Sequence, residues 1–157
     1  MDPRERPTIT WIDIVFFLFL AGLAALSPIR EIHKQFTLLA IGVFQLLEGS
    51  LIQRLPRRGP SYSVLIKILL ASLLIDHTGQ LGINSSYYQI YYVPILTAAI
   101  YFRYVGTLLW TTLASLAYCS FLIPALQEYE FTPSGASELA IRILFFYLAD
   151  VLVNSLV

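Results

Sequence analysis

Long apolar runs, separated by short polar segments, occupy most of this chain and restrict what it can fold into. Hydrophobic residues make up 57% of the 157 residues and charged residues only 13%, a balance far from that of a soluble domain. A helix needs about 20 mainly apolar residues to cross the hydrocarbon core of a bilayer. The pattern therefore predicts an all-α membrane protein.

Six of the runs are long enough to cross a bilayer, some of them with flanking residues included. The predicted spans cover residues 8–26, 36–52, 62–81, 87–104, 105–126 and 139–157. Proline, glycine and serine punctuate the connections, and Ser137 is a candidate N-cap for the last helix. Because no internal repeat or low-complexity linker interrupts the series, we expect a single transmembrane domain over 1–157.

Basic residues in the short loops predict the orientation of the spans, because Lys and Arg concentrate on the cytoplasmic side. With the N-terminus in the cytoplasm, the inner side holds Arg4, Arg6, Arg54, Arg57, Arg58 and Arg103. The outer side then holds only Arg30 and Lys34. The prediction is a bundle of six transmembrane helices with both the N- and C-termini in the cytoplasm.

Composition and motifs exclude several function classes for this segment. Ten basic and ten acidic residues cancel, so no overall positive field points to nucleic acid. Cys119 is the only cysteine, which excludes an internal disulfide and a cysteine-based zinc cluster. The sequence contains no phosphate-binding glycine loop, metalloprotease motif or nucleophile elbow. We therefore expect no enzyme activity, no catalytic residue, no metal and no cofactor in this segment.

Ionisable residues inside predicted spans are costly in hydrocarbon and are candidates for function. Counting about 1.5 Å of rise per residue places Asp13, Glu48, Lys67 and Asp150 in the cytoplasmic leaflet, with Asn154 one turn beyond Asp150. One interpretation is structural, with Lys67 pairing one of the acids. The other is a signalling cluster whose pairing changes when a stimulus arrives.

A second polar group is expected on the outer side of the membrane. It comprises His33, Asp76, His77, Glu138 and Arg142. Glu138 and Arg142 are four residues apart and can pair on one helix face. The two histidines come from different loops and could contribute to a metal or proton sensor. Their spacing matches no metal-ligand motif, so ordinary solvated loop residues remain the alternative.

Residues 91–110, which read YYVPILTAAIYFRYVGTLLW, carry a resemblance to a known family. They resemble the Tyr-Tyr-x-Pro-Ile-x-x-Ala-Ala-x-x-Phe-Gly pattern in the N-terminal multi-span sensor regions of bacterial sensor histidine kinases. The similarity continues through Leu122-Ile123-Pro124 and the last apolar helix. Arg103 stands where that pattern often has glycine, although Gly106 follows closely. Some diguanylate cyclases carry similar regions.

The resemblance implies that the chain is the membrane-embedded signal-input domain of a two-component sensor histidine kinase. The chain ends inside an apolar run, so we expect a cytoplasmic output domain beyond residue 157. The family also implies residence in the bacterial inner membrane, homodimerisation and a response regulator as partner. ATP and Mg²⁺ would serve the kinase domain, none of whose catalytic residues has a counterpart here.

The tyrosine-rich stretch around Pro94 is a candidate ligand pocket. Proline removes a backbone donor and can kink the fourth span. Tyr88, Gln89, Tyr91 and Tyr92 could line the wall of a pocket at such a kink. A packed, bent helix with interfacial tyrosines is the alternative.

Other functions are compatible with the same pattern of spans. Intramembrane charges and a first helix rich in small residues would suit a small six-helix transporter or a substrate-binding membrane subunit. The input domain of a diguanylate cyclase is a further possibility, and a purely structural anchor is another. The sequence that follows residue 157 in the gene would distinguish these functions.

Overall fold

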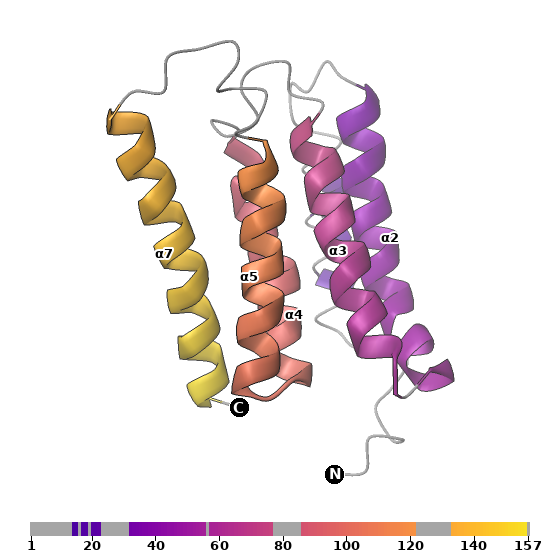
Figure 1. Ribbon diagram of the computed structural model, residues 1–157. Helices are drawn as coiled ribbons and strands as arrows, with labels where there is room; N and C mark the ends of the chain where they lie inside the picture. The colour runs from indigo at the N-terminus through magenta and orange to yellow at the C-terminus, as the bar shows by residue number, and fades with distance from the viewer. Residues whose placement is uncertain are drawn as a thin grey trace. The chain divides into compact units, whose positions relative to one another are not determined.

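The structure, a computed structural model, describes residues 14, 15, 17, 18, 20–22, 32–55, 57–76, 86–121 and 133–156. All the regular structure within these residues is helical, which confirms the all-α class (Figure 1). The chain divides into two compact units, Met1–Ser63 and Val64–Val157, with the division inside one helix. That the whole chain forms one domain stays a prediction.

The first unit contains α2, Ile32–Arg54, and the first residues of α3, Gly59–Asp76. Gly42 lets the Phe17 side chain approach α2, since a Cβ at Gly42 would lie 3.0 Å from Cδ2 of Phe17. The turn into α3 is also tight. The amide of Gly59 donates to the Leu55 carbonyl at 2.6 Å, and a Cβ at Gly59 would lie 2.8 Å from Cα of Ile52. Only glycine fits that position without displacing backbone.

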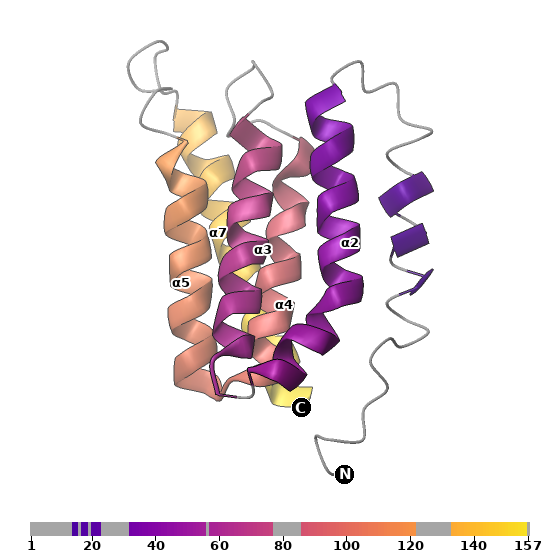
Figure 2. The ribbon, with the colours of Figure 1, turned by 90° about the vertical axis from the view of Figure 1, so that its right-hand side faces the viewer.

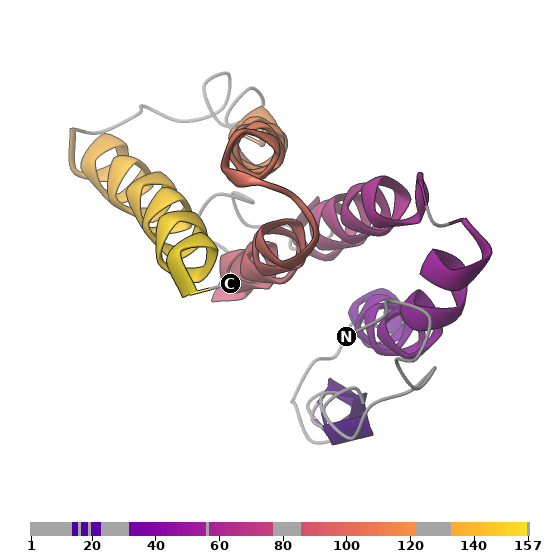
Figure 3. The same ribbon diagram turned by 90° about the horizontal axis from the view of Figure 1, so that it is seen from below.

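The second unit continues α3 from Val64 and adds the rest of the described helices. These are the 3₁₀ helix η3 (Ser86–Tyr91), α4 (Tyr92–Tyr101), α5 (Tyr104–Ser120) and α7 (Pro133–Leu156). Helices α4, α5 and α7 pack against one another pairwise. Figures 2 and 3 show this group from the side and along the helices.

Buried apolar side chains from every helix of the second unit form one core. Its members are Val64, Ile68, Ala71, Ile75, Tyr91, Ile95, Ala98, Ala114, Tyr118 and Phe146. The large aromatic members lie toward the end of the unit where η3 meets α4. This core therefore holds α7 against α4 and α5, and it fixes where the polar residues of α7 lie along those two helices.

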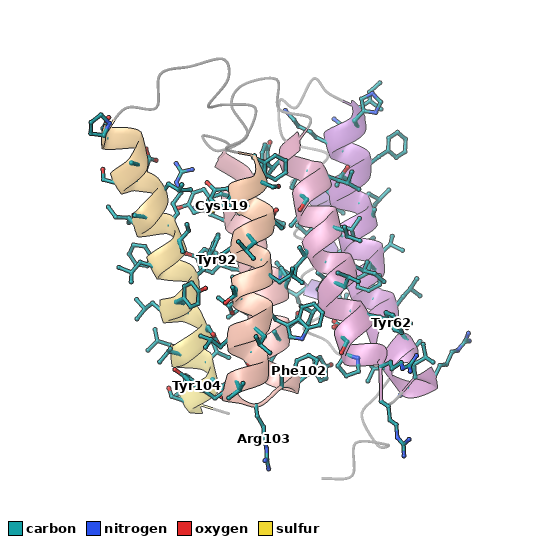
Figure 4. The ribbon with its side chains drawn as sticks, viewed as in Figure 1. Tyr62, Tyr92, Phe102, Arg103, Tyr104 and Cys119 are labelled. Atoms are coloured by element: carbon teal, nitrogen blue, oxygen red, sulfur yellow. The ribbon has the colours of Figure 1, made fainter. Side chains whose placement is uncertain are left out.

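Two residues, Phe102 and Arg103, connect α4 to α5. The extended backbone at Phe102 ends α4, and that at Arg103 precedes the first turn of α5. The Arg103 side chain points away from the helices (Figure 4). Phe102 folds back onto the first turns of α5, where its ring lies 6.0 Å from that of Trp110. Gly106 leaves space for it, since a Cβ there would lie 3.0 Å from Cβ of Phe102.

Two local expectations change in the structure. Helix α7 begins at Pro133, so Ser137 lies inside the helix and is not its N-cap. Proline is favoured at a first helical position, because the N–H it lacks would have no helical partner there. The irregularity expected at Pro94 lies ahead of it, where η3 gives way to α4 at Tyr92. Pro94 then occupies the first turn of α4 and breaks no helical hydrogen bond.

Helix α5 buries hydroxyl groups and exposes aliphatic side chains. Thr107, Thr111 and Ser115 are buried, whereas Val105 and Leu109 are each 67% exposed. A soluble helix normally shows the opposite arrangement. Small and hydroxyl-bearing residues at helix contacts, with aliphatic residues outside, are typical of helices surrounded by lipid.

Among the described helices, α2 and α7 are long and apolar enough to cross a membrane, with mean hydropathies of 1.5 and 1.8. The apolar part of α3, Gly59–Ile75, is shorter. Length and composition alone establish this property, and the core helices of soluble proteins can share it. The number of spans and the orientation of the two ends stay predictions.

Candidate functional site

The contact between α5 and α7 brings polar side chains of both helices together. The buried side of α5 carries Thr107, Thr111 and Ser115 at intervals of four residues, which places their side chains along one stripe. The facing side of α7 buries Phe146 and Asp150, with Asn154 one turn further. We call this contact the α5–α7 seam.

Hydrogen bonds show that α5 and α7 run antiparallel. At one end, the Asn154 side-chain amide donates to Oγ1 of Thr107 at 2.8 Å. At the other end, Nη1 of Arg142 donates to the Tyr118 hydroxyl at 2.8 Å. The hydroxyls of Thr112 and Tyr147 lie 2.9 Å apart between these two contacts. The seam therefore keeps one register along its length.

Asp150 lies within the seam and is fully buried. Neither of its carboxyl oxygens has a hydrogen-bond partner among the described residues. The Thr111 side chain lies beside this carboxyl, but its hydroxyl does not reach hydrogen-bond geometry and is itself unpartnered within the described part of the chain. Because buried polar groups are nearly always bonded, this pair is the least satisfied part of the seam.

The Ser115 hydroxyl lies one turn along α5 from Thr111 and is also buried without a described partner. Thr107, one turn in the other direction, differs from it. Its hydroxyl oxygen lies 3.2 Å from the Arg103 carbonyl, to which it donates, and it accepts the bond from Asn154. Along this face of α5 the Thr107 hydroxyl is therefore bonded, whereas the next two, those of Thr111 and Ser115, have no described partner.

Of the residues expected to form the inner-leaflet cluster, Glu48 belongs to the first unit, and Lys67, Asp150 and Asn154 belong to the second. Glu48 is buried in the first unit, where it accepts hydrogen bonds from Ser63 and, at 3.0 Å, from Nε2 of Gln45. Asp13 lies outside the described residues. In the second unit, Asp150 and Asn154 face α5. Whether these groups act together stays a prediction.

Lys67 is buried on α3 and contacts α4. Its ammonium donates to Oγ1 of Thr97 at 2.8 Å, and that hydroxyl donates to the Val93 carbonyl at 2.8 Å. The side chain is only 4% exposed. Thr97 therefore links the buried lysine to the backbone of the first turn of α4.

Aromatic rings close the other half of the seam. Tyr118 of α5 and Phe146 of α7 have ring centroids 5.8 Å apart in an edge-to-face arrangement. Tyr91 packs on both, with centroid separations of 5.6 and 6.1 Å. Its hydroxyl also lies 2.7 Å from Oγ of Ser72. The ring centroids of Tyr92, on α4, and Phe146, on α7, lie 5.2 Å apart in an edge-to-face arrangement, and Figure 4 labels Tyr92.

The candidate pocket residues thus belong mainly to packed contacts. Tyr91 and Pro94 are buried, Tyr92 is partly buried, and Gln89 is exposed. The Tyr88 ring lies under the Arg142 guanidinium, 4.5 Å from its carbon to the ring centroid. These contacts are those of an aromatic cluster that fixes α7, and a ligand at this place stays a prediction.

The outer-side group is represented by one ion pair. Arg142 pairs with Glu138 one turn earlier on α7, as their spacing predicts. His33 is exposed near the start of α2 in the first unit. His77 and the Asp76 side chain lie outside what the structure describes. No group of His, Cys, Asp and Glu that could hold a metal occurs among the described residues.

The sequence reasoning missed the hydroxyl groups of α5 and Tyr118 as members of the site. A signal for them was present, because Thr107, Thr111 and Ser115 repeat every four residues in an apolar run. Asp150 and Asn154 have the same spacing in the last helix. Two helices with matching four-residue polar spacing are candidates for one interface.

Comparison of the chain with protein families, with curated proteins and with solved structures found no match. The candidate site is therefore assigned from the contacts and burial of its residues alone.

Proposed function

We propose that the chain is a multi-pass signal-input domain of the bacterial inner membrane, with six spans and both ends in the cytoplasm. The length and apolar character of α2 and α7 support membrane insertion. So does α5, which directs its hydroxyls inward and its aliphatic side chains outward. Arg103, exposed at the turn between α4 and α5, would mark the cytoplasmic side.

One observation carries the signalling part of the proposal: the seam contains bonded polar pairs on both sides of an unbonded one. A buried unpaired carboxyl raises the free energy of the described arrangement. Because hydroxyls repeat every four residues along α5, a one-turn slide of α7 would bring Asp150 level with a neighbouring hydroxyl. Such a slide, of about 5.4 Å, is a known form of two-state helix movement.

In this proposal α7 relays the change to a cytoplasmic histidine kinase domain that uses ATP and Mg²⁺ and passes phosphate to a response regulator. A homodimer would be the working unit. A diguanylate cyclase output would use the same movement of α7. The resemblance of residues 91–110 supports the kinase, and sequencing the gene past Val157 distinguishes the two outputs.

Cysteine labelling tests the topology. In a Cys119→Ser background, single cysteines at Arg57, Arg103 and Ser134, all exposed positions, are treated with a membrane-impermeant maleimide. We expect Ser134→Cys to react in intact cells and the other two only after permeabilisation. Labelling of Arg103→Cys in intact cells would contradict the proposed orientation.

The switch is tested with Asp150→Asn in the complete gene product, with Ser120→Ala as the matched control because Ser120 is exposed on α5. Removing the unsatisfied charge favours the described register. We expect autophosphorylation to change at least about fivefold, the effect of roughly 1 kcal/mol on a two-state balance. Spin labels at Arg103→Cys and Ser137→Cys report the distance between the α4–α5 turn and the first turns of α7. If α7 has two registers, Asp150→Asn should remove one of the two distance populations. Unchanged output together with unchanged distances would exclude the mechanism.

The buried carboxyl also favours a second candidate function, an ion-coupled transporter. An unpaired acid between two transmembrane helices is a common feature of ion pathways. Ion-dependent substrate uptake by proteoliposomes that contain this chain alone would support transport over signalling. A cytoplasmic output domain encoded after the last helix would favour signalling.

A further inference from the structure

The Asp150 carboxyl in the seam requires a partner that the described residues do not supply. Its side chain is fully buried and both oxygens are unbonded within the described residues. Thr111 lies beside it with an unbonded hydroxyl. Two buried, adjacent and unpartnered oxygen groups are rare in proteins, and a bound ion or water is a recurrent explanation.

We propose that Asp150 and Thr111 form the centre of a Na⁺ site between α5 and α7. Every polar atom that the seam offers here as an acceptor is an oxygen. The carboxylate and the Thr111 hydroxyl are adjacent, and the Thr107 hydroxyl and the Asn154 side chain lie one turn away. Hard cations prefer carboxylate, hydroxyl and carbonyl oxygens, whereas softer metals prefer nitrogen or sulfur.

The charge of the seam favours a monovalent ion. Helices α4 and α5, which pack against α7, contain no charged residue. On α7 itself, Arg142 lies two turns away and is bonded to Glu138 and Tyr118. One carboxylate balances one positive charge. A divalent ion would leave an uncompensated charge in a buried interface, which is costly.

The signalling role of the ion rests on the proposed function. Binding of the ion does not, because it can be measured without a kinase output. Occupancy would stabilise the register in which Asp150 faces Thr111. Loss of the ion would leave the carboxylate unpaired and favour the shifted register. The stimulus class would then be the concentration of a small inorganic cation.

The test uses the purified chain in nanodiscs, with NaCl replaced by choline chloride at constant ionic strength. We expect the melting temperature to rise saturably with Na⁺, by about 5 °C or more at a hundredfold excess over the dissociation constant. Trp110, next to Thr111 on α5, should report the same titration by fluorescence once Trp11→Phe removes the other tryptophan. Asp150→Asn and the isosteric Thr111→Val should abolish both responses, and Ser120→Ala should retain them.

Three results would overturn the site. They are no response to Na⁺ in the unmodified chain, an unaltered midpoint in Thr111→Val, and a response to pH between 5 and 8 that is independent of Na⁺, which would indicate a proton. Na⁺ binding that is lost in Asp150→Asn supports the site even when the kinase output is insensitive to Na⁺. That combination would refute the signalling role alone.

Discussion

The two halves of the α5–α7 seam differ in how well their groups are satisfied. The half at Tyr118 and Phe146 is an aromatic cluster in which the side chains of Tyr91, Tyr118 and Arg142 each have a polar partner. The half at Asp150 leaves a carboxyl and a hydroxyl without one among the described residues. The first half is suited to hold α7 in place, and the second to respond to a ligand or a shift of the helix.

The largest effect is expected where the aromatic half is broken. Phe146→Ala removes a fully buried ring that contacts Tyr91, Tyr92 and Tyr118. We expect it to lower the free energy of unfolding by about 3–5 kcal/mol, measured by SDS-driven unfolding in mixed micelles. Phe145→Ala is the control, because Phe145 is 49% exposed. Equal losses in both variants would show that Phe146 does not anchor α7.

The difference between the two halves of the seam depends on helix positions, which the sequence predicts, and on contacts between helices, which it predicts only in part. Apolar runs predict helices, and the spacing of Glu138 and Arg142 predicts their ion pair. The partner of a threonine is less predictable, because its hydroxyl can bond its own helix backbone, as Thr112 does to Leu108. Pairing along the seam depends on the register between helices, which core packing sets.

At the helix ends, neighbouring residues favour different positions for the start of the helix. Ser137 has the composition of an N-cap, yet Pro133 starts α7 one turn earlier. Pro94 suggests a kink near the outer half of the fourth span, yet the preceding 3₁₀ turn places it in the first turn of α4, where it is tolerated. In both cases the proline lies within the first turn of a helix, and the sequence alone does not show where that helix starts.

In the polar half of the seam, a substitution should raise the free energy of unfolding, whereas Phe146→Ala lowers it. Asp150→Asn replaces an unsatisfied carboxyl with a neutral amide that can donate to Thr111. In choline buffer we expect the free energy of unfolding to rise by about 1–3 kcal/mol, the cost of an unsatisfied buried group. A loss of stability would mean that the carboxylate already has a partner, and the difference between the two halves would disappear.

The smallest effects separate the two kinds of hydroxyl on α5. Thr107→Val removes the acceptor of the Asn154 bond and should destabilise the protein by about 1 kcal/mol. Ser115→Ala removes a buried hydroxyl that has no described partner, so it should stabilise the protein by about 1 kcal/mol. Both variants are measured by the same unfolding assay in choline buffer. A Ser115→Ala loss as large as that of Thr107→Val would place a bonded partner at Ser115 and extend the satisfied half of the seam toward Asp150.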